Sequence, residues 1–127
     1  MNRLWVVIAL AIGGALGTNA RHWLGFWVRE WAGTRFPWGT FLINVSGSFA
    51  IGFLAISLDR WVRMPELRLM VITGFLGGYT TFSAYSLETL LLWERGEPIR
   101  ALAYLAGSAL AGFAAVMLGV VLGRQWS

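Results

Sequence analysis

The chain has 127 residues, of which 57% are hydrophobic and only 13% are charged. This charged share is about half that of a soluble domain, so we expect one small domain that lies in the lipid bilayer. The net charge of +4 comes entirely from arginines scattered singly along the chain, which argues against nucleic-acid binding and for headgroup contact. Because there is no cysteine, disulfides and thiolate metal sites are excluded.

Four uncharged stretches predict an all-α membrane protein with four transmembrane helices. About 20 apolar residues cross a bilayer as a helix. The stretches are residues 4–20, 36–58, 69–87 and 101–123. Within one transmembrane domain, residues 1–127, we expect spans at about 4–24, 36–58, 67–93 and 99–123. All eight tryptophans lie near or between stretch ends, as in an aromatic belt.

The first stretch has two interpretations. Arg3 followed by an apolar run resembles a cleaved signal peptide. The run continues further than a signal peptide needs, however, and Gly13 and Gly17 form a GxxxG helix-packing pattern. We therefore favour a retained span, which residues 24–31 either extend or follow along the membrane interface.

The second stretch carries a polar stripe. Thr40, Asn44 and Ser48 are spaced four residues apart, so they lie on one face of a helix. The amide of Asn44 offers two N–H donors and no charge, so it could hold an anion and leave it mobile. Hydrogen bonding between helices is the alternative reading of this stripe.

The third stretch contains poor helix formers at its centre. The glycine pair Gly77 and Gly78 is followed by Thr80 and Thr81, which predicts a break near residues 77–80 at mid-membrane depth. Broken membrane helices free backbone carbonyls that bind ions, and those of Gly77 and Thr80 would suit a hard cation such as sodium. The alternative is a kink used only for packing.

Aromatic and hydroxyl side chains follow this break. Phe82 and Tyr85 are three residues apart, and their positively polarised ring edges could line an anion path. Tyr104 and Ser108 offer hydroxyl donors on one face of the fourth span, with Gly112 one turn further. Core packing and interhelical hydrogen bonding are the alternatives.

Few charged groups lie near the spans. Glu88 is the only carboxylate within a span-like stretch, and His22, the sole histidine, is expected at the interface. Arg21 either draws anions into a vestibule or anchors the helix at the headgroups. The sequence has no metal-ligand cluster, catalytic triad or phosphate-binding loop, so we expect no enzyme.

The arginines divide equally between the two expected sides of the membrane. One side has Arg3, Arg60, Arg63, Arg68 and Arg124, and the other has Arg21, Arg29, Arg35, Arg95 and Arg100. Since a positive-charge bias sets orientation, this balance predicts an antiparallel, dual-topology homodimer. Local charges near the first span are the alternative determinant. A solute path also favours a second copy, because four helices enclose little polar space.

Three segments, in order, resemble the Fluc/CrcB fluoride channel family. Residues 13–22, GGALGTNARH, resemble its GGxxGAxxRY opening. Residues 39–49, GTFLINVSGSF, resemble its GTLxVNxxGSF segment, and residues 74–85, GFLGGYTTFSAY, resemble its GFxGGxTTFSTF segment. Length and span count also fit.

The resemblance implies a fluoride-selective channel that exports fluoride passively across a bacterial-type plasma (inner) membrane, with two pores per antiparallel homodimer. It implies a structural sodium ion at the dimer interface, held by backbone carbonyls of Gly77 and Thr80 from each chain. The implied anion pathway contains Asn44, Phe82, Tyr85, Ser83, Thr40, Tyr104, Ser108, Arg21 and Glu88.

Five positions depart from the family pattern and concern throughput, not the class of function. They are Tyr85 for Phe, Ala84 for Thr, Gly112 for Ser, His22 for Tyr and Thr18 for Ala.

A small dual-topology, proton-coupled drug or guanidinium exporter is the main rival, but it needs a glutamate in the first span, and the first acidic residue here is Glu30. A fluoride/proton antiporter would have Glu88 as its only candidate proton carrier, and a structural subunit without transport is a third possibility.

Overall fold

The computed structural model describes residues 1–126 and is helical throughout, with no strand in that range. Three helices are long and apolar enough to cross a membrane: α1 (Arg3–Ala32), α2 (Trp38–Trp61) and α6 (Pro98–Trp126). This confirms the expected all-α class. Four shorter segments lie between α2 and α6: α3 (Pro65–Leu69), the π-helix η1 (Met70–Leu76), α4 (Gly77–Tyr79) and α5 (Phe82–Glu94). None of them alone is long enough to span, so a fourth span stays a prediction.

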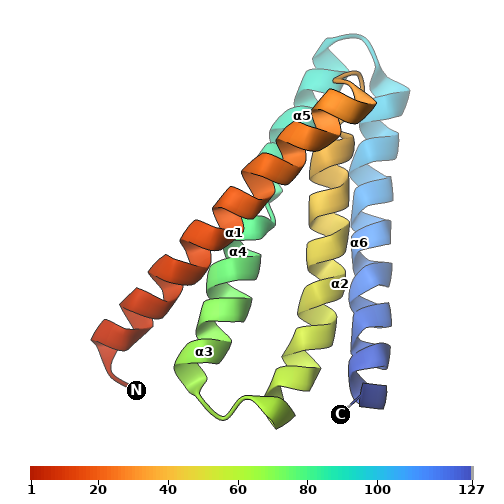
Figure 1. Ribbon diagram of the computed structural model, residues 1–127. Helices are drawn as coiled ribbons and strands as arrows, with labels where there is room; N and C mark the ends of the chain where they lie inside the picture. Colours follow the sequence, from red (N-terminus) through yellow and green to blue (C-terminus); the bar gives the residue numbers. More distant parts are fainter. Residues whose placement is uncertain (127) are drawn as a thin grey trace.

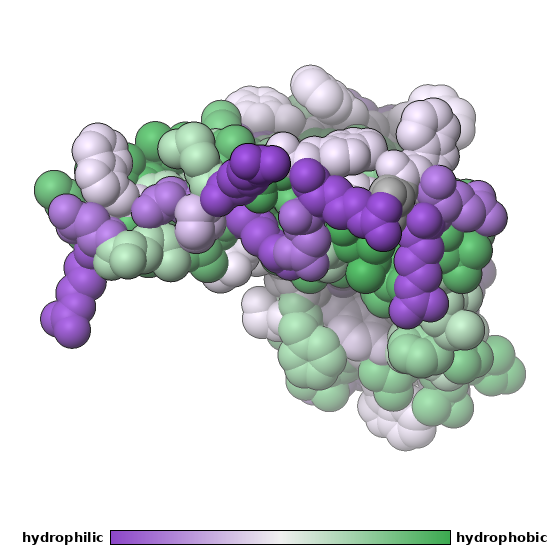
Figure 2. All heavy atoms as spheres, turned by 90° about the horizontal axis from the view of Figure 1, so that it is seen from below, coloured by the Kyte–Doolittle hydropathy of each residue, from purple (hydrophilic) through white to green (hydrophobic). Residues whose placement is uncertain are grey.

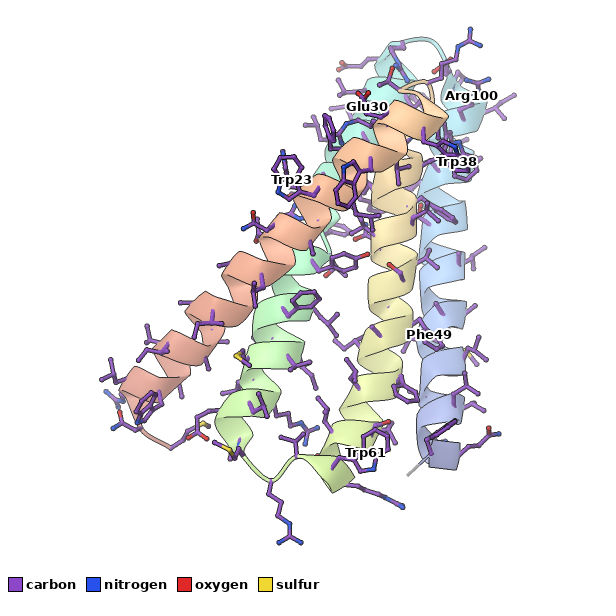
Figure 3. The ribbon with its side chains drawn as sticks, viewed as in Figure 1. Trp23, Glu30, Trp38, Phe49, Trp61 and Arg100 are labelled. Carbon is purple, nitrogen blue, oxygen red and sulfur yellow. The ribbon has the colours of Figure 1, made fainter. Side chains whose placement is uncertain are left out.

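The termini and two of the helix connections lie at opposite ends of the molecule. Both termini lie at one end, and the α1–α2 and α5–α6 connections lie at the other (Figure 1). Segments α3 to α5 together run between the two ends beside α1 (Figure 1). Trp38 lies toward one end and Trp61 toward the other (Figure 3), the arrangement expected of an aromatic belt.

Helix α1 is longer than the span expected from the sequence. The Asn2 side chain accepts a hydrogen bond of 2.9 Å from the Leu4 N–H at its start, and Gly33, at φ 81°, ends it. Residues 24–31 therefore continue the helix instead of following it along the interface. Thirty residues give a helix of roughly 45 Å.

Glycines allow the helices to approach backbone to backbone. A Cβ atom at Gly13 would collide with the Met70 carbonyl, and one at Gly17 with the Phe75 carbonyl, where α1 crosses η1. Likewise, a Cβ at Gly52 would collide with Val116, and one at Gly119 with Phe49, where α2 packs along α6. These close contacts lie within one chain, which accounts for the small-residue spacing without a second copy.

The helical path is interrupted between α4 and α5. Thr80 (φ −80°, ψ 156°) and Thr81 (φ −149°, ψ 116°) are extended, whereas Gly77 is still helical. The interruption thus falls at the threonines, at the edge of the predicted residues 77–80, because β-branched residues favour extended backbone. Preceding it, η1 is a π-helix, which the sequence did not predict.

The side chains buried within this single chain are few. A small core holds Tyr85, Leu92, Ala101 and Tyr104, against which Phe36 and Phe41 pack. Many large apolar residues remain exposed along the sides, including Leu110 and Phe113 of α6. Hydrophilic residues instead gather across the end that carries the termini (Figure 2). Apolar sides and polar ends are what a bilayer selects.

Candidate ion-binding sites around the helix interruption

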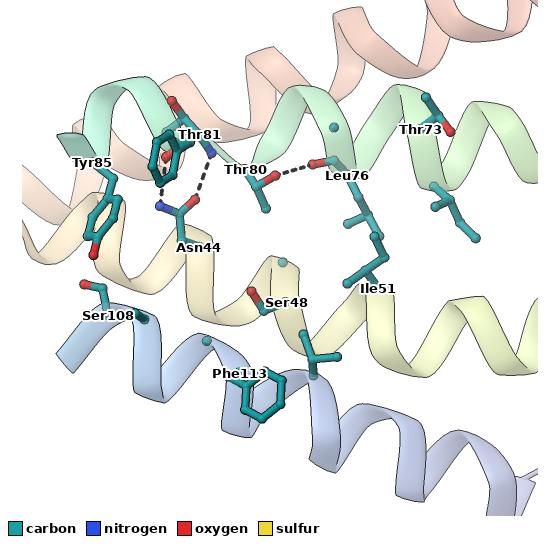
Figure 4. A pocket seen from close by; sticks show the side chains of 17 residues that line it. Asn44, Ser48, Ile51, Thr73, Leu76, Thr80, Thr81, Tyr85, Ser108 and Phe113 are labelled. Carbon is teal, nitrogen blue, oxygen red and sulfur yellow. Dashed lines mark hydrogen bonds between the residues drawn. The ribbon is translucent and has the colours of Figure 1, made fainter. Parts of the chain in front are cut away.

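Asn44 of α2 pairs with the backbone at the interruption. Its Nδ2 donates to the Thr81 carbonyl at 3.0 Å, and its Oδ1 accepts from the Thr81 N–H at 2.8 Å (Figure 4). The amide thus pairs with both backbone groups of Thr81, whose N–H has no helical acceptor. One amide hydrogen of Asn44 is left for another acceptor.

The same interruption changes the partners of three carbonyls. In a continuous helix the N–H of residue i donates to the carbonyl of residue i−4, so Thr81 would donate to Gly77 and Ala84 to Thr80. Here the Thr81 N–H donates to Asn44, and the Ala84 N–H donates to the Thr81 hydroxyl at 3.2 Å. The carbonyls of Gly77 and Thr80 therefore lose their helical donors.

Arg21 of α1 supplies the partner of a third carbonyl. Its Nε donates to the Gly78 oxygen at 3.1 Å, and a guanidinium at the carboxyl end of a helical segment is favourable. Arg21 is half-buried and lies at the level of the interruption. It also lines a cavity, as a vestibule residue would.

Glu88 of α5 joins three helices. Its Oε1 accepts from the Thr40 hydroxyl of α2 at 2.9 Å, and its Oε2 accepts from the Tyr104 hydroxyl of α6 at 2.8 Å. Tyr104 is almost fully buried. The structure thus brings together three predicted pathway residues, with the carboxylate held by two neutral donors and by no cation among residues 1–126.

The two ring positions after the interruption differ. Tyr85 is buried, its hydroxyl donates to the Leu105 carbonyl of α6, and its ring packs edge-on to Tyr104 at 5.3 Å between centroids. Phe82 is 79% exposed and lies 5.8 Å from Tyr85. The Tyr85 hydroxyl is therefore bound to backbone and does not point at Phe82.

A large cavity lies between α2, α6 and the interrupted segments. It encloses about 660 Å³ (Figure 4). Lining residues that the sequence singled out are Asn44, Ser48, Gly77, Thr80, Phe82, Tyr85, Ser108 and Gly112. The Ser108 hydroxyl is buried and has no hydrogen-bond partner among residues 1–126, so it can serve a ligand or a second chain.

The smaller cavity, about 270 Å³, lies between α1, α2 and the start of α5. Its polar lining residues are Thr18, Arg21, His22, Arg29, Thr40, Thr81 and Glu88. Thr81 lines both cavities, so the interruption separates them. Ser83 lines neither; its hydroxyl lies 3.3 Å from the Thr81 hydroxyl.

Two residues of this region were not predicted as functional. Thr81 pairs with Asn44 and caps α5, and a threonine three residues before the Ala84 N–H is an N-cap signal that could have been read. The sequence shows Arg29 only as one of the arginines at an end of a span, because no sequence pattern says that its side chain turns toward a cavity. No group of three or more acidic, histidine or cysteine residues able to hold a metal occurs in residues 1–126.

The helices define a multi-pass membrane protein, whose polar interruption holds uncharged donors and two carbonyls that have lost their helical donors. A family model described as "CrcB-like protein, Camphor Resistance (CrcB)" matches residues 8–120. The chain belongs to this CrcB-like family.

Curated relatives match nearly the whole chain. A protein of Rhizobium meliloti is 45% identical over 93% of this chain and 95% of its own length. One of Acidobacterium capsulatum is 46% identical over 98% of both chains, and one of Chloroflexus aurantiacus is 41% identical over 93% of this chain and 94% of its own. Each is named "Fluoride-specific ion channel FluC".

Proposed function

We propose that this protein is a fluoride-selective channel that lets fluoride leave the cytoplasm passively, as an antiparallel homodimer with two pores. The family match and relatives named as fluoride-specific channels support the ion and the class. The single structural observation that carries the proposal is the hydrogen-bonded interruption, where Asn44 pairs with Thr81 beside two cavities, the larger of which has only uncharged lining residues.

The chemistry of fluoride fits these neutral donors. Fluoride is small and strongly hydrated, so a pore must replace its water with many donors. Conduction also requires binding weak enough for release. The free amide hydrogen of Asn44, the unpartnered Ser108 hydroxyl and the ring edge of Phe82 meet both needs, because none carries a charge.

A fourth crossing of the membrane is supported by the path of the chain. Three spans cannot return both termini to one end, whereas Figure 1 shows both there. Segments α3 to α5 supply the missing crossing, with the interruption near its middle. The polar side chains of Asn44, Arg21 and Glu88 have protein partners there, as the apolar interior of a bilayer requires.

Dual topology rests on the arginine balance, which the structure alters slightly. Arg21 lies at the interruption, bound to Gly78, so it counts for neither end. The end with the termini then has five arginines, and the other end has Arg29, Arg35, Arg95 and Arg100. A difference of one arginine is too small to fix a single orientation.

A second copy would complete the site. Phe82 and Phe113 line the larger cavity and are largely exposed in one chain. An antiparallel partner that covers this face would bury both rings and wall off the cavity.

The freed carbonyls fit a structural sodium ion. Those of Gly77 and Thr80 have lost their helical donors, and a Cβ atom at Gly77 would meet nothing within 4 Å. Two oxygens from each copy would make a four-oxygen site, and oxygen is the ligand that hard cations prefer. When bound, the ion would supply a fixed positive charge between the copies.

A fluoride/proton antiporter is the rival that one observation favours, since Glu88 lines the smaller cavity. The drug-exporter class is disfavoured because α1 carries no acidic residue before Glu30.

Efflux from liposomes holding only this protein tests the proposal and separates these classes. We expect rapid fluoride loss at a fluoride electrode, chloride loss close to that of protein-free liposomes, and a fluoride current that an imposed pH gradient does not drive. Fluoride uptake driven by the pH gradient would replace the channel with an antiporter, and vesicles that keep their fluoride would reject both.

A further inference from the structure

The smaller cavity holds more positive than negative charge. Two guanidinium groups, Arg21 and Arg29, and one carboxylate, Glu88, line it. None of the ion pairs found in residues 1–126 joins either arginine to Glu88. The cavity therefore has cationic charge that the chain itself does not neutralise.

Two of these three groups already have fixed partners. The Nε of Arg21 is bound to the Gly78 carbonyl, and both oxygens of Glu88 accept hydroxyl hydrogen bonds. These contacts hold the interrupted helix against α1, α2 and α6. If either side chain moved, a backbone carbonyl or a hydroxyl group would lose its hydrogen-bond partner.

Arg29 differs from both. It lies in the last turn of α1, and its side chain turns back along the helix, as helical side chains do. A Cβ atom at Gly25 would lie 3.3 Å from its Nη1, so the guanidinium sits over Gly25, where there is no competing side chain. Its side chain makes no hydrogen bond or ion pair in residues 1–126.

We propose that Arg29 holds a small inorganic anion in this cavity before the anion reaches Glu88 and Thr81. A guanidinium has five donors and no acceptor, and Thr18 and His22 add further polar groups to the same wall. The ligand is a monovalent ion, fluoride in a working channel, with chloride as a competitor. This inference deepens the proposed function, since it names the residue that collects the transported ion.

Electrostatics gives Arg29 a recognisable signature. A cleft with one sign of charge and apolar walls raises the local concentration of counter-ions. Arg29 is exposed, so salt screens it, with a Debye length near 10 Å at 0.1 M ionic strength and about 3 Å at 1 M. Its contribution must therefore be large at low ionic strength and small at high ionic strength, unlike that of a residue with a packing role.

The flux test compares Arg29→Gln with Arg35→Gln. Arg35 lies at the same end, does not line the cavity and has no side-chain hydrogen bond or ion pair in residues 1–126, so it controls for loss of charge. At subsaturating fluoride and low ionic strength, we expect flux to fall about threefold in Arg29→Gln and to stay near wild type in Arg35→Gln and Arg29→Lys. At saturating fluoride or about 1 M salt, all four proteins should agree.

A binding measurement keeps this inference separate from channel activity. Broadening of the fluoride ¹⁹F NMR signal by detergent-purified protein at low salt should weaken in Arg29→Gln but not in Arg35→Gln. Equal broadening in both variants would overturn the role of Arg29, even if wild-type vesicles conduct. Reduced broadening in Arg29→Gln with no flux from wild-type vesicles would uphold the anion site and reject the channel.

Discussion

At the scale of single residues, Asn44 both pairs with the Thr81 backbone and lines the larger cavity. In Asn44→Asp the carboxylate cannot donate to the Thr81 carbonyl and adds a negative charge beside the proposed anion path. We expect fluoride flux to fall by about tenfold or more, because a partner of a half-buried acceptor is lost.

The matched control for this change is Asn19→Asp. Asn19 also donates its Nδ2 to a carbonyl, that of Ala15, but it is exposed on α1 and lines neither cavity. Flux through Asn19→Asp should stay within about twofold of wild type, since exposed hydrogen bonds contribute little. Equal losses in both variants would show that the pairing of Asn44 with Thr81 is not special. Both are measured by the same vesicle efflux assay.

Tyr85 leads to the opposite expectation. Its hydroxyl is bound to the Leu105 backbone, so Tyr85→Phe should lower stability by about 1 kcal/mol and leave fluoride flux within about twofold. Thermal unfolding in detergent and vesicle efflux measure the two quantities. Tyr79→Phe, which loses only the bond to exposed Ser46, serves as control. A tenfold change in flux for Tyr85→Phe would mean that this hydroxyl contacts the ion.

At the scale of helices, close packing predicts which glycines are essential. Gly17→Ala would drive a methyl group into the Phe75 carbonyl, so we expect a loss of about 2 kcal/mol or more. Gly107→Ala, also within a helix, meets nothing within 4 Å and should be neutral or slightly stabilising. Unfolding temperatures in detergent should differ in this order. Equal temperatures would contradict the packing of α1 on η1.

Sequence patterns predicted the helices better than their interruptions. Long apolar stretches bounded by charges and tryptophans indicated α1, α2 and α6, since the bilayer imposes their length. The weak helix formers indicated an interruption, but its extended residues are Thr80 and Thr81, because Gly77 continues the helical backbone of η1, which packs closely on α1 at Gly13 and Gly17. A π-helix depends on such packing and leaves no periodicity to read.

The same distinction applies to the candidate site, where local spacing was informative and contacts between helices were not. Side chains on one helical face, such as Thr40 and Asn44, were predicted together because spacing fixes their direction. The carboxylate bridge from Thr40 through Glu88 to Tyr104 joins three helices, so no local spacing contains it. The turn of Arg29 over Gly25 likewise depends on where α2 packs.

At the scale of the whole molecule, orientation in the membrane should respond to single arginines. With five arginines at the end that bears the termini and four at the other, wild-type chains should insert both ways. Paired C-terminal reporters, one active outside the membrane and one inside, should therefore both give signal. A signal from one side only would reject dual topology.

Two variants of equal net charge should shift the ratio of the two membrane orientations in opposite directions. Arg63→Gln removes a positive charge near the termini and equalises the two ends, whereas Arg35→Gln widens the difference to two arginines. Since the more positive end stays in the cytoplasm, Arg35→Gln should raise the fraction of C-termini inside and Arg63→Gln should lower it. A single arginine should change this ratio without making either orientation scarce, so the proposed antiparallel pair can still form, and fluoride flux should stay near wild type in both variants.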